Sequence, residues 1–211
     1  MSTFGIVTGF GAEAALLAGG PWRVAMAGGR PERALALART LAAEGCGLLL
    51  SFGIAGGLNP ALRPGALVVA DRVFGPDGRH LAAAPALFPD LTARRGPVAA
   101  AATVVADPAA KARLFAATGA LAVDLESWGV AQAAEEAGLP FGVLRAVADP
   151  APRALPPAAA EGLDDQGNVR LGAVLLSLVK DPRQLPGLVR VGLDTRAALA
   201  ALKAAVAALP R

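Results

Sequence analysis

Two acidic motifs in the second half of the chain carry the side chains best suited to chemistry. The first, Val-Asp-Leu-Glu, ends at Glu126, and the second, Leu-Arg-Ala-Val-Ala-Asp, ends at Asp149. An expected helix and strand separate them, so the two carboxylates lie at opposite ends of one strand-helix-strand unit and can converge on one pocket. A third acid, Glu13, follows a glycine turn near the N-terminus. Together the three acids predict an enzyme that cleaves a bond to the anomeric carbon of a sugar.

Each acid also has an ordinary structural explanation. Glu126 starts an expected helix, where a negative charge complements the helix dipole, and the same explanation holds for Asp124. Asp149 precedes a proline and can cap a turn. Glu13 taken alone carries no signal. The interpretation as a site rests on position, because Glu13, Glu126 and Asp149 all follow the C-terminal ends of expected strands.

The elements that must position these acids alternate along the chain. Short apolar runs rich in β-branched residues alternate with helical segments rich in Ala, Leu and Arg, which is typical of an α/β sheet covered by helices on both faces. The sequence therefore predicts a three-layer α/β/α fold, with functional groups where strands end. The predicted strands are 4–8, 22–27, 48–52, 66–74, 97–101, 120–124 and 141–147. The predicted helices of the main body are 31–44, 108–118 and 127–137.

The C-terminal part is predicted to be a helical tail that starts at about residue 168. Residues 150–157, rich in proline and alanine, form the loop that leaves the last strand. Asp181 is the expected N-cap of a tail helix, with a proline at its first position. The apolar spacing predicts that the tail packs on the main body, so residues 1–211 are interpreted as one domain. The expected tail helices are 171–179, 182–191 and 195–209.

Two glycine-rich turns follow predicted strands. Gly9 to Ala14 matches a permissive form of the dinucleotide-binding fingerprint, with alanine in place of the third glycine. The second strand lacks the acid that would hold ribose hydroxyls, but Arg30 could meet a 2′-phosphate, so an NADP-dependent oxidoreductase stays as a minor alternative. The second turn, Ser51 to Leu58, lets a ligand approach backbone amides. A tight strand-to-loop corner explains that turn equally well.

Composition narrows the classes of function. The 20 Lys and Arg against 17 Asp and Glu leave a net charge of +3 without a basic run, which argues against nucleic-acid binding. The single Cys46 and the single His80 argue against a zinc site and an internal disulfide. Without a signal sequence or an apolar run of about 20 residues, a cytoplasmic protein is expected. The mean hydropathy of +0.50 is high and indicates an apolar cavity, an oligomer interface or a membrane-facing patch.

The order and spacing of four motifs resemble the purine and uridine phosphorylase superfamily, and within it the branch of methylthioadenosine and adenosylhomocysteine nucleosidases. The resemblance covers residues 4–149 and implies an α/β/α fold around a central mixed sheet, like that of nucleoside phosphorylases. Its motifs are Gly5-Ile6-Val7 through Glu13, Gly53 to Leu58 followed by Pro64 to Val69, Val123 to Glu126, and Arg145 to Asp149.

A closer resemblance, to the hopanoid-associated phosphorylases, extends over nearly the whole chain. It implies release of adenine from adenosylhopane during synthesis of the hopanoid side chain. A lipid-linked nucleoside as substrate also implies contact at the inner face of the membrane, and members of the superfamily are homo-oligomers. The stretches that carry this resemblance are 51–65, 119–127, 148–150, 154–157 and 181–186.

The resemblance implies a role for each acid and for several neighbours. Asp149 matches the aspartate that delivers a proton to N7 of the leaving purine. Glu126 matches the glutamate that binds the ribose hydroxyls, and Glu13 the glutamate that positions the attacking water. The remaining substrate contacts implied by the resemblance are the turn residues Gly53, Ile54, Ala55 and Gly56, the purine neighbours Val104 and Val105, and Leu125 beneath the sugar.

The nucleophile is expected to be water. Ser51 and Ile54 stand where phosphorolytic relatives tend to have a phosphate-binding Arg and Ser. Gly9 and Arg30 could still hold phosphate as a co-substrate, so phosphorolysis stays open; no other cofactor and no metal is expected. The alternatives are a phosphorylase or nucleosidase for small purine nucleosides, and a lipid-binding carrier without activity.

Overall fold

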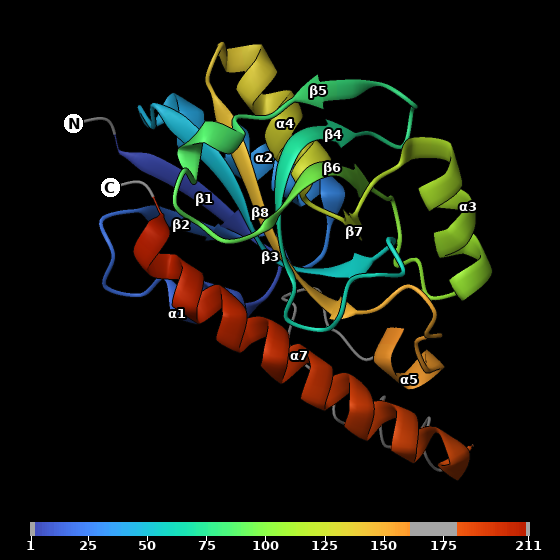
Figure 1. Ribbon diagram of the computed structural model, residues 1–211. Coiled ribbons are helices and arrows are strands. Elements are labelled where there is room, and N and C mark those ends of the chain that lie inside the picture. The colour runs from blue at the N-terminus through green and yellow to red at the C-terminus, as the bar shows by residue number, and fades with distance from the viewer. Residues whose placement is uncertain (1–2, 161–180, 210–211) are drawn as a thin grey trace.

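The structure is a computed structural model that describes residues 3–160 and 181–209. A twisted sheet lies between helices (Figure 1). The strands are β1 Phe4–Thr8, β2 Arg23–Met26, β3 Leu48–Gly57, β4 Leu67–Phe74, β5 His80–Ala82, β6 Arg94–Ala100, β7 Ala122–Asp124 and β8 Phe141–Asp149. The α-helices are α1 Gly11–Leu16, α2 Pro31–Ala43, α3 Pro108–Thr118, α4 Ser127–Ala137, α5 Pro157–Ala160 and α7 Leu185–Ala205. Short 3-10 turns cover Pro85–Leu87, Pro182–Gln184 and Val206–Ala208.

All strands of the described residues belong to one mixed sheet. β1 lies parallel to β2 and β3, and β3 lies parallel to β8 along most of its length. The end of β3 turns to pair antiparallel with β7, which runs parallel to β6. β4 pairs with β6 and, in the opposite direction, with β8, so β3, β7, β6, β4 and β8 close into a ring. The predicted mixed α/β sheet is confirmed.

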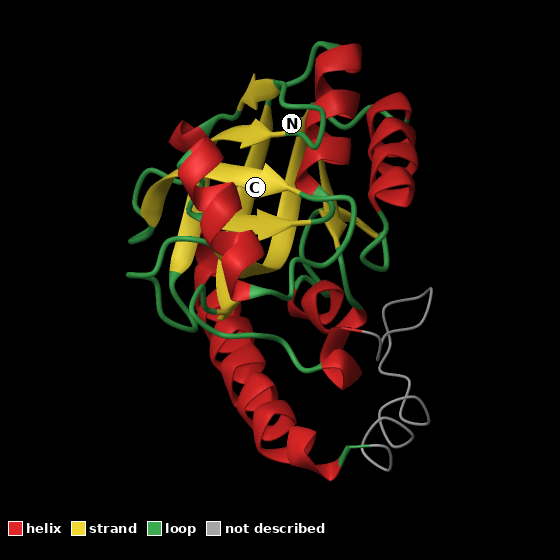
Figure 2. Ribbon diagram, turned by 90° about the vertical axis from the view of Figure 1, so that its right-hand side faces the viewer, coloured by secondary structure: helices red, strands yellow, loops and turns green. Residues whose placement is uncertain are grey.

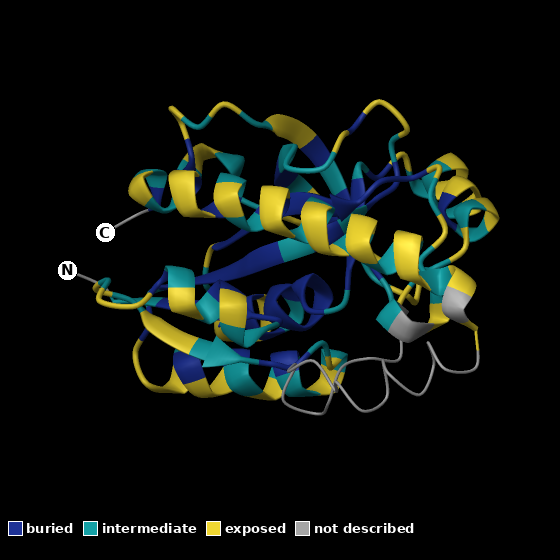
Figure 3. Cartoon of the chain, turned by 90° about the horizontal axis from the view of Figure 1, so that it is seen from below, coloured by how far each residue is buried: buried dark blue, intermediate teal, exposed yellow. Residues whose placement is uncertain are grey.

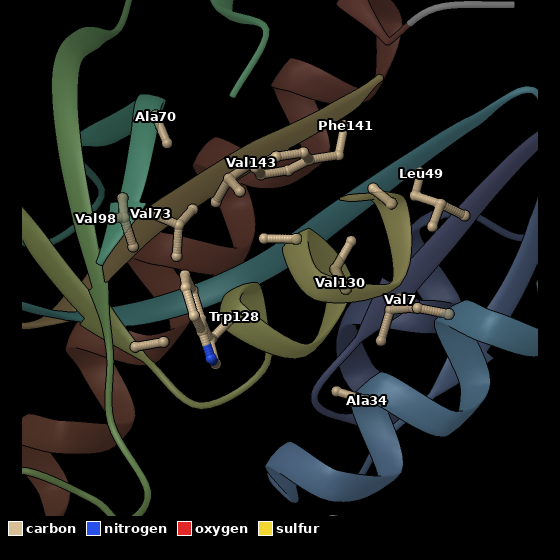
Figure 4. Packing of buried hydrophobic residues seen from close by; sticks show 14 of the residues in the cluster. Val7, Ala34, Leu49, Ala70, Val73, Val98, Trp128, Val130, Phe141 and Val143 are labelled. Carbon is tan, nitrogen blue, oxygen red and sulfur yellow. The ribbon is translucent and has the colours of Figure 1, made fainter. Parts of the chain in front are cut away.

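Helices α2 and α4 form the layer on one face of the sheet. Their buried side chains, with Trp128 among them, pack against β-branched residues of the strands (Figure 4). The two helices approach closely at Gly129, where a Cβ atom would lie 2.7 Å from the Leu35 backbone nitrogen. A side chain at Gly129 would therefore force the two helices apart. The predicted bounds of α3 and α4 agree with the structure, and α2 ends one residue earlier than predicted.

Helix α7 covers the opposite face of the sheet (Figure 2). Its buried residues Ala198, Leu202 and Ala205 pack with Ile6 and Phe52 from the strands. Seen from below, the outer side of α7 is mostly exposed (Figure 3). The predicted packing of the tail on the main body is thus confirmed for this helix. Among the described residues, no helix has the length and hydrophobicity needed to cross a lipid bilayer.

Three expectations about the elements need correction. The tail does not break between 191 and 195, because α7 runs through Gly192, which weakens a helix by only about 1 kcal/mol. Asp181 accepts a hydrogen bond from the Arg183 amide at 3.1 Å, but it caps a 3-10 turn rather than an α-helix. The predicted strands also lack the short edge strand β5, which contains His80. The predicted helix 171–179 lies outside the described residues.

Candidate active site

The register of β3 explains why the two acidic motifs meet. Gly56, near the end of β3, pairs on one side with Val123 of β7 and on the other with Asp149 of β8. The ends of β7 and β8 therefore lie on either side of one glycine. This places the start of the turn to Glu126 and the end of β8 at the same edge of the sheet, as the sequence predicts.

A cavity of about 760 Å³ opens at this edge. The three acids Glu13, Glu126 and Asp149 all line it, although they come from α1, the turn before α4 and the end of β8. The structure thus brings together the three residues that the sequence singles out. The other predicted substrate contacts that line the cavity are Ile54, Ala55, Gly56, Val104, Val105 and Leu125.

Glu13 is held by backbone amides. Its Oε2 accepts hydrogen bonds from the amides of Gly9 at 2.7 Å and Phe10 at 2.9 Å, and its Oε1 accepts one from Ile54 at 2.7 Å. Burial raises the pKa of Glu13, against the opposing effects of Arg145 and these amides. Each carboxylate oxygen has two lone pairs, so Oε1 can accept one further hydrogen bond from a water molecule.

Gly53 does not line the cavity, in contrast to its predicted role in substrate contact. A Cβ atom there would lie 2.5 Å from Glu13 Oε1 and 2.7 Å from Arg145 Nη1. The glycine is needed because these two charged side chains fill the space beside it. The turn at Gly53 therefore makes room for charged side chains of the site. A ligand could contact this turn only at Ile54, Ala55 and Gly56, which line the cavity.

Arg145 is a site residue that the sequence reasoning missed. It is fully buried in β8 and lies 2.7 Å from Asp124 and 3.3 Å from Glu126. Its Nη2 also donates hydrogen bonds to the hydroxyls of Ser51 at 2.5 Å and Ser127 at 3.2 Å. The signal for it was present, because an arginine inside an otherwise apolar buried strand requires carboxylate partners.

Asp124 and Glu126, two residues apart, have different roles in the site. Asp124 accepts hydrogen bonds from the amides of Glu126 and Ser127 and from the Ser127 hydroxyl, so it caps the start of α4, as its structural explanation predicts. Glu126 lines the cavity, and its Oε2 lies 3.3 Å from Arg145. Burial raises the pKa of Glu126 to about 7, and the nearby carboxylates of Asp124 and Glu13 act in the same direction against Arg145.

Asp149 has an unpredicted partner in Lys111 of α3. The Lys111 ammonium group is completely buried and contacts Asp149 Oδ2, while the buried Asp149 Oδ1 has no hydrogen-bond partner in the part of the chain that the structure describes. Burial raises the pKa of Asp149, and the hydrogen bond and positive charge of Lys111 oppose that rise. Local sequence patterns do not point to Lys111, because a lysine on a surface helix usually faces water.

The residues proposed for phosphate lie outside the cavity. Arg30 is exposed at the residue before α2, and Gly9 contributes its amide to Glu13 instead. Among the residues that the structure describes, no Lys or Arg side chain lines the cavity. Within the same part of the chain, no cluster of three or more His, Cys, Asp or Glu side chains is arranged to hold a metal ion.

One wall of the cavity comes from α7. Apolar side chains of α7, together with Leu155 from the loop after β8, line the part of the cavity that lies across from the three acids. The lining residues of α7 are Leu188, Val191, Gly192, Thr195 and Leu199. The cavity thus joins a small group of carboxyl groups to a largely hydrocarbon surface, and its volume falls in the upper part of the range for small-molecule pockets, roughly 300–1,000 Å³.

The ring-closed mixed sheet between two helical layers, with acids at the strand ends, defines a nucleoside phosphorylase-like α/β protein. The family model described as the phosphorylase superfamily matches residues 3–92 and 74–180. The chain belongs to the phosphorylase superfamily, which confirms the predicted superfamily and, with it, the prediction of an enzyme. Comparison with curated protein sequences finds no match.

Solved structures with the same fold include several nucleosidases. The Helicobacter pylori 5′-methylthioadenosine/S-adenosylhomocysteine nucleosidase with 5′-methylthioadenosine in its active site is 17% identical, with a TM-score of 0.70 over 99% of this chain and 100% of that one. The futalosine hydrolase of Helicobacter pylori is 19% identical, with a TM-score of 0.68 over 85% and 98%. The Streptococcus pyogenes S-adenosylhomocysteine nucleosidase is 18% identical, with a TM-score of 0.64 over 92% and 96%.

Proposed function

We propose that the protein cleaves the N-glycosidic bond of a purine nucleoside with water as the nucleophile. The observation that carries this proposal is the meeting of Glu13, Glu126 and Asp149 in one cavity. Membership of the phosphorylase superfamily supports it. The fold neighbours support it as well, because two of them contain 5′-methylthioadenosine and 5-methylthiotubericidin as bound ligands.

The chemistry follows from the charges that develop as the bond breaks. Cleavage between C1′ and N9 leaves a cation-like sugar and an electron-rich purine. Asp149, protonated, gives a proton to N7 of the purine through its free Oδ1, and acid catalysis of this kind contributes about a hundred- to ten-thousand-fold. Glu126, ionised, accepts hydrogen bonds from the ribose hydroxyls, and its charge favours the cationic transition state.

Water is the nucleophile that the lining of the cavity favours. Glu13 has one lone pair on Oε1 that is not used by the amide of Ile54, and this lone pair can orient a water molecule toward C1′. A phosphate dianion would instead meet three carboxyl groups and no basic side chain from the described residues. Repulsion between these charges disfavours phosphorolysis.

The proposed substrate is adenosylhopane, as the resemblance to hopanoid-associated phosphorylases implies. The apolar wall that α7 and Leu155 provide suits a large hydrocarbon at the 5′ position. A pentacyclic hydrocarbon buries several hundred Å², which at roughly 25 cal/mol per Å² supplies several kcal/mol of binding. Contact with the inner face of the membrane and a homo-oligomeric state remain predictions that go with this substrate.

The test is release of adenine by the purified protein from adenosylhopane, adenosine and methylthioadenosine, each with and without phosphate. The expected result is the highest kcat/KM for adenosylhopane, with free ribosyl product of the same mass in both buffers. Formation of a ribose 1-phosphate product would show that phosphate, rather than water, is the nucleophile. A wide preference for adenosine or methylthioadenosine would overturn the lipid-linked substrate. Asp149→Asn should lose adenine release and keep binding, whereas a carrier would have no turnover to lose.

A further inference from the structure

We propose that Lys111 is a positioning residue for Asp149, which fixes one oxygen of the carboxyl group and stabilises the carboxylate that remains when the other oxygen releases its proton. This inference rests on the proposed function, in which Asp149 is the acid. It adds a residue that does not line the cavity and acts only through Asp149.

The surroundings of Lys111 match its three N–H donors. Its Nζ contacts Asp149 Oδ2 and donates to the backbone carbonyls of Arg153 at 3.1 Å and Pro150 at 3.4 Å. The side chain is completely buried, so no solvent competes for these donors. A buried ammonium group with all three donors engaged has a single orientation, and it transmits that orientation to Asp149.

The helix that carries Lys111 is itself fixed in place. Asp107 caps α3 by accepting a hydrogen bond from the Ala110 amide at 2.8 Å, and Lys111 lies in the first turns of this helix. The loop after β8 is attached to the same region, because the Leu155 amide donates to the Ala106 carbonyl at 3.0 Å. Lys111 therefore joins α3, the loop and the end of β8 at one point.

The hydrogen bonds of the pair are unequal in a way that indicates catalysis. An ion pair that serves stability alone is expected to satisfy both carboxylate oxygens, since buried polar atoms are nearly always hydrogen-bonded. Here the lysine is fully satisfied, whereas the buried Asp149 Oδ1 has no partner among residues 3–160 and 181–209, and Asp149 lines the cavity. The unused hydrogen-bonding capacity therefore belongs to Oδ1, the oxygen that Lys111 does not contact and that we propose releases the proton.

The step balances without any change in the lysine. The C1′–N9 bond breaks and its electron pair stays on the purine, the Oδ1–H bond of Asp149 breaks, and an N7–H bond forms. The water oxygen bonds to C1′ and its proton passes to Glu13. Lys111 keeps its protons throughout, and its charge lies next to the new carboxylate. The other charged group facing Asp149 is Arg153, which is paired with Asp194 of α7.

The experiment is a double-mutant cycle of Lys111→Met and Asp149→Asn, with adenine release measured across pH on the best wild-type substrate. Lys111→Met should lower the plateau of kcat/KM by about tenfold, because Asp149 becomes a weaker acid. Lys111→Met should also raise the pH above which activity is lost by about one pH unit. In the Asp149→Asn background, removing the lysine should change the residual rate by less than about twofold.

The outcomes that overturn the inference are specific. A Lys111→Met enzyme with an unchanged pH profile, or losses that multiply fully in the double variant, would make Lys111 a structural residue only. Lys203→Met, on the exposed side of α7, is the matched control and should keep wild-type activity. If Lys111→Met does not fold, Lys111→Gln, which keeps two donors without the charge, gives the same test. An inactive wild type would overturn the proposed function itself, which separates the two failures.

Discussion

Arg145 and Asp124 form a buried ion pair, with 2.7 Å between Nε and Oδ2, that joins the middle of β8 to the end of β7. Glu126 lies 3.3 Å from the same guanidinium group, and the charge of Glu13 also acts on it. One arginine thus faces three buried carboxyl groups. If all three were ionised, the cluster would carry excess negative charge, and the raised pKa of Glu126 follows from this imbalance and from burial.

The first prediction concerns the pH dependence of activity. Glu126 must be ionised to accept the ribose hydroxyls and to favour a cationic transition state, and burial raises its pKa to about 7. The kcat/KM for adenine release should therefore rise as the pH increases through about 7, since this constant reports the free enzyme. The measurement is a pH profile between 5 and 9. If kcat/KM decreased only below about pH 5, ionisation of Glu126 would not control the reaction.

The second prediction is that Glu126→Gln stabilises the fold while it abolishes activity. The folded-state pKa lies above the ordinary 4.5, so the stability that protonated Glu126 contributes is present below pH 4.5 and is lost as the pH rises through about 7. At pH 8 the variant should gain about 1–3 kcal/mol of unfolding free energy, and at pH 5 much less. Urea unfolding at both pH values measures it. Glu32→Gln, at an exposed site, is the control and should change the free energy of unfolding by the same amount at both pH values. If Glu126→Gln also changed it by the same amount at both pH values, the prediction would be contradicted.

Asp124→Asn should have the opposite effect on stability. It removes the partner at 2.7 Å from a fully buried arginine and weakens the cap of α4. Breaking a buried ion pair from one side costs about 3–5 kcal/mol when the remaining charge is left unpaired, and Glu126, 3.3 Å from the same guanidinium group, lowers that cost here. Asp71→Asn breaks the exposed pair with Arg72 and should cost less than about 1 kcal/mol. Urea unfolding of the two variants compares them directly, and equal losses would count against a structural role for the buried pair.

The sequence reveals the acids of the site more readily than their partners. Glu126 and Asp149 end apolar runs, and strand ends at one edge of a sheet are where side chains from distant motifs meet. Lys111 lies on α3, whose sequence pattern is typical of an exposed helix. It is buried only because the loop after β8 folds over its Nζ. Glu13 was predicted through resemblance, whereas its three amide donors come from turns whose geometry the sequence does not specify.

The same contrast applies to the elements. Helices with clear caps, such as α3 between Asp107 and Gly119, are predicted with correct ends. Strand β3 continues past residue 52 to Gly57, because pairing with β7 and β8 outweighs the low strand propensity of its glycines. The three residues of β5 are too few for any periodicity to appear. Tertiary pairing, which local patterns do not contain, decides these cases.

The final prediction tests whether α7 recognises the hydrocarbon of the substrate. Leu188 lines the cavity, whereas Leu193 on the same helix is 62% exposed and does not. Leu188→Ala should lower kcat/KM for adenosylhopane in detergent micelles by about tenfold, since losing about 1.4 kcal/mol of apolar burial corresponds to that factor, and should change the value for adenosine by less than about twofold. Leu193→Ala removes the same atoms outside the cavity and should leave both substrates unaffected. If the two variants behaved alike, or if adenosine suffered as much as adenosylhopane, the wall formed by α7 would not be the surface that selects a lipid-linked nucleoside.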